Sequence, residues 1–97
     1  MDWLAQHTAA APPTLGHRAR HYVSESAATE SLPAALAAAA TAALDTVARQ
    51  TEGRGAALDL LAADALITLA LLAQAEADPS RLHAFATGIL HAEAARA

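Results

Sequence analysis

The longest apolar segment of the chain runs from Gly55 to Ala77 and predicts a helix that other helices must cover. It holds eight of the sixteen Leu and Ile residues, and no Gly or Pro interrupts it after Gly55. At 100° per residue its large side chains do not keep to one face, because Leu58 and Leu66 point to one side while Leu61 and Leu72 point to another. A helix that is apolar nearly all round is covered on several sides.

Shorter segments with one apolar face predict the surrounding helices, over residues 1–11, 13–24, 31–50 and 79–94. Pro12 follows the first of them, and a residue before proline avoids the helical region. Ser31 and Asp78 stand where the N-caps of the last two helices are expected. The turn over residues 51–55 contains two glycines, either of which is suited to the left-handed residue after a helix.

These elements predict an all-α fold, a small antiparallel helical bundle of four to five helices around the central apolar helix. The 97 residues are expected to form a single domain. Its parts are the N-terminal helices over 1–24, a polar connection over 24–31 and a three-helix antiparallel core over 31–97. Composition agrees, because the chain has 31 Ala but only two Val and two Ile, so strands lack their preferred residues.

Charge and composition narrow the partners and the compartment. A net charge of −4, with six Arg and no Lys, gives no long-range attraction to a polyanion, so we expect no nucleic acid partner. The absence of Cys excludes disulfides and thiolate metal sites. The first residues do not resemble a secretory signal, and we expect a cytoplasmic location. The central segment is long enough to span a membrane, but Asp59 and Asp64 oppose insertion, so we expect no membrane association.

The central helix also predicts self-association. The flanking helices each offer only one apolar stripe, which is limited cover for a helix that is apolar on every side. Pairing of two copies would cover the remainder, and small symmetric oligomers are mostly two-fold. We therefore expect a homodimer. The alternative is a monomer in which the N-terminal helices fold over the open side.

Three residues at helical spacing form the strongest candidate for a metal site. His17, His21 and Glu25 follow an H-x3-H-x3-E pattern, which places all three on one face of a helix. The same patch, with Arg18 and Arg20, has the charge to hold a phosphate or carboxylate. The alternative is a solvated helix face. No cofactor is predicted.

Other histidines have simpler interpretations. His7 follows Trp3 by four residues and is expected to pack against it. His83 and His91 share a face without touching each other and are expected at the surface.

A second candidate is a buried polar site in the central helix, formed by Asp59, Asp64 and Thr68. A buried carboxylate must be paired, hydrogen-bonded or neutral, and Asp64 lies one turn before Thr68. Either both aspartates emerge at exposed positions or pair with arginines, or one of them lies in a pocket of the core or of a dimer interface. The arginines considered for such pairs are Arg49, Arg54 and Arg81.

The sequence does not name a function. It contains no phosphate-binding loop, nucleophile elbow, zinc-protease motif or calcium loop. The leading hypothesis is a non-enzymatic helical interaction or scaffold module that acts as a homodimer, with a further protein partner possible. One alternative is a small metal- or anion-binding bundle that uses His17, His21 and Glu25. The other is an enzyme whose pocket at a dimer interface uses Asp59 or Asp64 with histidines.

Overall fold

The computed structural model describes residues 2–25, 31–50 and 53–96, and these form an all-α bundle with no strand among them. The predicted fold class is therefore confirmed. The helices are α1 (Asp2–Thr8), α2 (Pro13–Glu25), α3 (Leu32–Arg49), α4 (Arg54–Ala77) and α5 (Leu82–Arg96), and a 3-10 turn, η1 (Pro79–Arg81), precedes α5.

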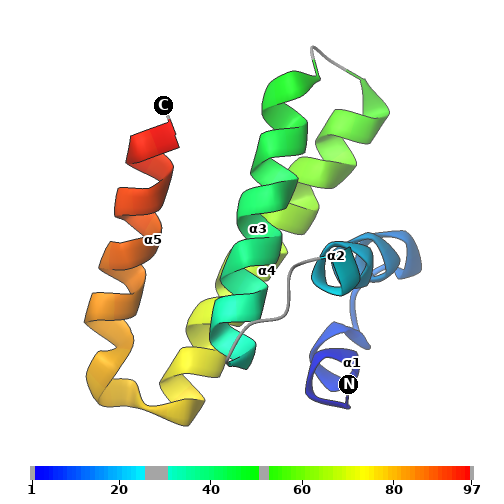
Figure 1. The fold of residues 1–97 in the computed structure, drawn as a ribbon. Helices are drawn as coiled ribbons and strands as arrows, with labels where there is room; N and C mark the ends of the chain where they lie inside the picture. Colours follow the sequence, from blue (N-terminus) through cyan, green and yellow to red (C-terminus); the bar gives the residue numbers. More distant parts are fainter. Residues whose placement is uncertain (1, 26–30, 51–52, 97) are drawn as a thin grey trace.

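The α3–α4 hairpin is the centre of the fold (Figure 1). The two helices run side by side and make the most extensive contact in the bundle. Their buried positions are mostly alanines, which let helix backbones approach closely. The fully buried residues of the pair are Leu36, Ala39 and Ala43 of α3 and Ala62, Leu66 and Ala70 of α4. The central helix thus begins one residue before the predicted Gly55 and ends at the predicted Ala77.

Local signals in the sequence place the helix starts. The hydroxyl of Ser31 accepts a hydrogen bond from the Ala34 amide at 3.3 Å, and the carboxylate of Asp78 accepts one from the Ser80 amide at 3.1 Å. Both predicted N-caps are confirmed. Gly53 has a φ of +118°, which L side chains rarely adopt, and it precedes α4 as its N-cap instead of following α3 in the left-handed conformation.

The N-terminal helices complete the core. Leu4 of α1 and Ala19 and Tyr22 of α2 are buried in the same cluster as the hairpin, and α2 packs against both α3 and α4. α1 approaches α2 closely at Gly16, where a Cβ atom would lie 3.7 Å from the carbonyl oxygen of Thr8. The N-terminal helices therefore fold over one open side of the hairpin.

The fifth helix packs differently. We expected it to be the third helix of an antiparallel core, but no residue from 82 to 95 is buried. Phe85 is its one contribution to the packing around the core cluster. α5 leaves the hairpin at η1 and stands apart from α3 along most of its length (Figure 1). The core is thus formed by α1 to α4.

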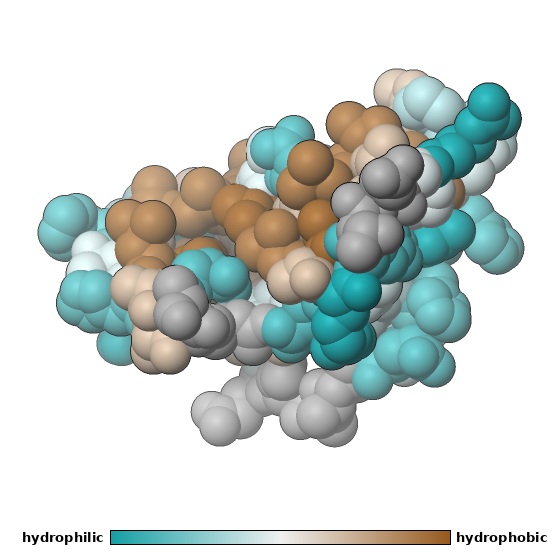
Figure 2. All heavy atoms as spheres, turned by 90° about the horizontal axis from the view of Figure 1, so that it is seen from above, coloured by the Kyte–Doolittle hydropathy of each residue, from teal (hydrophilic) through white to brown (hydrophobic). Residues whose placement is uncertain are grey.

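Much apolar surface remains uncovered. In the view from above, hydrophobic residues form a band across the middle of the molecule, and hydrophilic residues gather at its ends (Figure 2). The exposed large side chains are Leu60, Leu61 and Leu72 of α4 and Leu90 of α5. By length and composition α4 also meets the criteria for crossing a membrane, criteria that core helices of bundles share, and 33% of its most apolar 18-residue window is buried.

Candidate functional site

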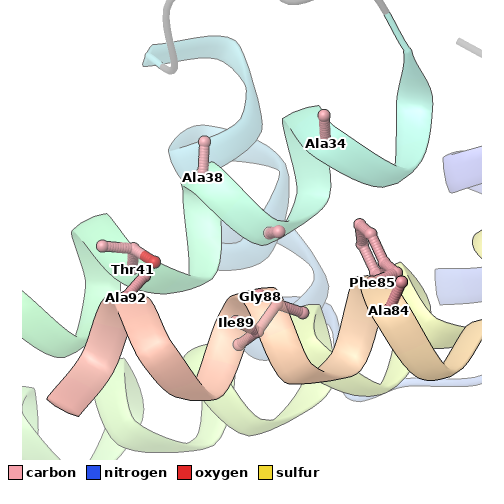
Figure 3. A pocket seen from close by; sticks show the side chains of 9 residues that line it. Ala34, Ala38, Thr41, Ala84, Phe85, Gly88, Ile89 and Ala92 are labelled. Atoms are coloured by element: carbon pink, nitrogen blue, oxygen red, sulfur yellow. The ribbon is translucent and has the colours of Figure 1, made fainter.

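The α5 side of the bundle contains an apolar groove of about 340 Å³ between α3 and α5. Phe85 lies at one end of the groove, and Thr41 and Ala92 lie at the other (Figure 3). The lining residues are Ala34, Ala37, Ala38 and Thr41 of α3 and Ala84, Phe85, Gly88, Ile89 and Ala92 of α5. They recur every three or four positions, so each helix presents one continuous face to the groove.

The chemistry of the groove is uniform. None of its lining residues is charged, and the Thr41 hydroxyl, its one polar side-chain group, donates a hydrogen bond to the Glu93 carboxylate at 3.3 Å. Such a surface holds apolar groups and offers no nucleophile, acid or base. Sequence reasoning missed this groove because it placed α5 in the core. The available signal was the four-residue spacing of Ala84, Gly88 and Ala92.

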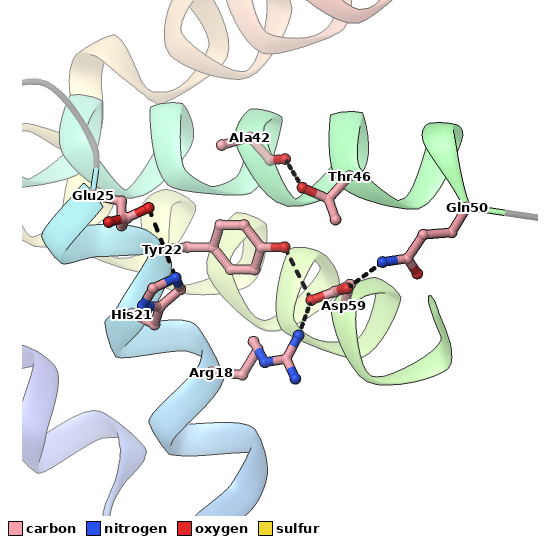
Figure 4. Close-up of polar contacts among 8 residues, drawn as sticks. All are labelled: Arg18, His21, Tyr22, Glu25, Ala42, Thr46, Gln50 and Asp59. Carbon is pink, nitrogen blue, oxygen red and sulfur yellow. Dashed lines mark hydrogen bonds and ion pairs between the residues drawn. The ribbon is translucent and has the colours of Figure 1, made fainter. Parts of the chain in front are cut away.

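The buried carboxylate of Asp59 is the centre of a polar cluster on the opposite side of the hairpin (Figure 4). Asp59 is 1% exposed. Its Oδ1 accepts hydrogen bonds from Nη1 of Arg18 at 2.6 Å and from the Tyr22 hydroxyl at 2.9 Å. Its Oδ2 accepts one from the Gln50 amide at 3.2 Å. Both oxygens are therefore engaged, and three elements meet at one side chain.

This cluster is a structural connection. It ties α2 and the C-cap of α3 to α4, and every donor comes from within the chain. Asp59 pairs with Arg18 rather than with any of the three arginines considered from the sequence. The signal for this pair was the i, i+4 spacing of Arg18 and Tyr22, which puts both donors on one face of α2. An aspartate in an apolar helix needs such donors when it is buried.

The other two members of the predicted buried polar site lie at the surface. Asp64 and Thr68 are exposed, and the Thr68 hydroxyl donates to the backbone carbonyl of Asp64 at 3.0 Å. Both line a cavity of about 290 Å³ between α4 and the N-terminal helices. His7 and Leu15 also line this cavity. The structure therefore separates Asp59 from Asp64 instead of placing them in one pocket.

The predicted metal ligands lie on the outer face of α2. His17, His21 and Glu25 are exposed, and Nε2 of His21 lies 3.8 Å from the Glu25 carboxylate. Within the described part of the chain, no three His, Asp or Glu side chains are grouped so that they would hold a metal ion. The arginines of this patch already have partners, since Arg18 binds Asp59 and Arg20 donates to the Thr8 hydroxyl at 3.2 Å. The metal and anion hypotheses stay predictions.

The remaining histidines lie as expected. The rings of Trp3 and His7 are stacked with centroids 3.9 Å apart, so the packing pair is confirmed. Sequence analysis missed their partner on α4, Glu76, whose carboxylate accepts a hydrogen bond from the Trp3 indole at 2.8 Å. His83 and His91 are both exposed.

Comparison with protein-family models, with curated proteins and with solved structures finds no match to this chain. The functional argument therefore rests on the geometry of the bundle itself.

Proposed function

We propose that the chain is a non-enzymatic helical interaction module that acts as a homodimer, and that its α5 side is the surface on which a second copy docks. The observation that carries this proposal is the apolar surface that the single copy leaves uncovered. No residue from 82 to 95 is buried, although α5 has only one acidic and one basic end residue, Glu93 and Arg96, besides its two histidines.

The total surface area supports a missing partner. The single copy has an accessible surface of 6026 Å². A compact monomer of 9.9 kDa is expected to have about 5,200 Å² by the scaling of surface area with mass. The excess is about 800 Å², the area that each partner buries in a standard protein interface. One additional copy would therefore bring the surface of this chain into the ordinary range.

The position of the excess favours the α5 side. The other open side of the hairpin is already covered by α1 and α2, which are held there by the Asp59 cluster. On the α5 side, the groove is apolar and uncharged, so its occupant must also present apolar surface. A second copy carries such a surface on its own α5. Two copies that use the same face form a closed two-fold contact, the commonest form of small oligomer.

The test is the molar mass in solution, measured by light scattering after size exclusion across a tenfold dilution. We expect a mass near twice 9.9 kDa that falls toward 9.9 kDa only at the lowest concentrations. A mass of 9.9 kDa at every concentration would show that the chain is a monomer and would overturn the proposal.

A further inference from the structure

We infer that α5 of a second copy lies in the groove between α3 and α5, so that the two α5 helices pack antiparallel about a two-fold axis near Gly88. This inference rests on the proposed homodimer and specifies which face of α5 forms it. The excess surface of about 800 Å² sets the size of the occupant, because a standard interface buries that area on each partner. The uncharged lining sets its chemistry.

The wall of the groove on α5 is shaped for a close helix. Ala84, Gly88 and Ala92 are spaced by four residues and lie on one face of α5 (Figure 3). All three are exposed in the single copy. The distance between packed helix axes depends on the side chains at the contact, and small residues give the shortest distances. A helix that docks here would therefore approach the α5 backbone closely.

Gly88 gives a separate reason for a close partner. Glycine in the interior of a helix is less favourable than alanine, so its presence calls for an explanation. At Gly16 the explanation is the nearby Thr8, and at Gly53 it is the positive φ. A Cβ atom at Gly88 would meet nothing within 4 Å. The single copy thus gives no reason for glycine at this position, whereas a second helix against it would.

Symmetry selects α5 as the docking helix. Gly88 lies near the middle of α5, a helix of 15 residues and about 22 Å in length. A two-fold axis near Gly88 places the N-terminal half of one α5 against the C-terminal half of the other. Each α5 then lies in the groove of the other copy, and the contact is complete after two copies. Helices α3 and α5 of both copies form a four-helix arrangement.

Leu90 supplies an internal control. It is the most exposed large apolar side chain, at 69% exposed, and is the residue that hydropathy alone would select as the contact. It follows Gly88 by two residues, which places it about 200° around the helix, on the side away from the groove. The proposed geometry therefore leaves Leu90 outside the interface.

The principal experiment compares three variants by sedimentation equilibrium, with helix content measured by circular dichroism. Gly88→Leu places a bulky side chain between the two helices and is expected to raise the dimer Kd at least about 100-fold, the size of a hot-spot effect. Gly55→Leu makes the same substitution in the first turn of α4, where a Cβ also meets nothing within 4 Å. This control and Leu90→Gln are expected to change the Kd less than about threefold, as surface positions do.

A smaller substitution separates a role in the dimer from a role in the fold. Gly88→Ala improves helix propensity and has room in the single copy, so at concentrations where monomer prevails the Tm should rise by roughly 2 to 8 °C. The added methyl group lies in the proposed contact, so the dimer Kd should rise about tenfold. These opposite signs also keep the test valid if Gly88→Leu does not fold.

The outcomes distinguish this inference from the proposed function. A dimer that keeps its wild-type Kd in Gly88→Leu or Gly88→Ala uses another face, and this overturns the inference while the homodimer stands. Dissociation by Leu90→Gln has the same meaning. A wild-type chain that is monomeric at every concentration overturns both.

Discussion

The two sides of the α3–α4 hairpin differ in how their helices are attached. On one side, α1 and α2 add Leu4, Ala19 and Tyr22 to the buried core, and Asp59 binds α2 through two hydrogen bonds. On the other side, α5 is at least as apolar in sequence, yet none of residues 82–95 is buried. Apolar content alone therefore does not decide which helix packs.

The difference lies in directional contacts and in the length of the connection. Hydrogen bonds to a buried carboxylate require one register and one orientation, because an unsatisfied buried charge is costly. α2 meets this requirement with a guanidinium and a phenol one helical turn apart. α5 has no such anchor, and its polar contact to α3 runs from Thr41 to Glu93 near the end of the groove. This leaves its small-residue face available to a second copy.

The largest expected effect compares one aromatic residue on each side. Tyr22→Ala removes a buried ring that packs in the core cluster and should lower the free energy of unfolding by about 3 to 5 kcal/mol. Phe85→Ala removes a ring that is only half buried against the same cluster, and about 1 to 2 kcal/mol is expected. Urea unfolding followed by circular dichroism at low protein concentration measures both. Equal losses would show that α5 packs as firmly as α2.

The next effect tests the polar anchor. Asp59→Asn keeps the shape of the side chain but removes the charge that Arg18 binds, and a loss of about 2 kcal/mol is expected. The value is below that of a fully buried pair because the Arg18 side chain is 37% exposed and water replaces part of the lost interaction. Asp64→Asn makes the same change at an exposed position of α4 and should alter stability by less than about 0.5 kcal/mol.

A result in which both aspartate variants unfold at the same urea concentration as the wild type would contradict an anchoring role for Asp59. A loss in both would show that the net charge of α4, rather than the cluster, is responsible. Only a loss confined to Asp59→Asn supports the difference between the two sides.

Local sequence signals predicted the helices well, and long-range pairing limited the rest. Ser31 and Asp78 act through backbone amides two or three residues away, so their capping roles follow from the sequence. The partner of Asp59 lies 41 positions away, and several arginines carry the same chemistry. Periodicity shows that α5 has apolar residues, but not whether the hairpin can accept it beside α1 and α2. The groove depends on that choice and was not predictable.

The smallest expected effect concerns the attachment of α1 within the firmly packed side. Glu76 accepts a hydrogen bond from the Trp3 indole, and its side chain is 51% exposed. Because exposed contacts of this kind contribute little, Glu76→Ala should lower the free energy of unfolding by about 0.5 kcal/mol. Trp3 is the one tryptophan of the chain, so its fluorescence reports on this contact directly. We expect its emission to shift to longer wavelength in the folded variant.

Glu25→Ala provides the matched control, because it removes the same charge from an exposed glutamate that pairs with His21 on α2. Its emission spectrum should equal that of the wild type. If Glu76→Ala also leaves the emission unchanged, the stacked Trp3 and His7 rings and buried Leu4 hold α1 without Glu76. If it lowers stability by as much as Asp59→Asn, α1 depends on a polar anchor of its own, and the directional contact that distinguishes the two sides extends from α2 to α1.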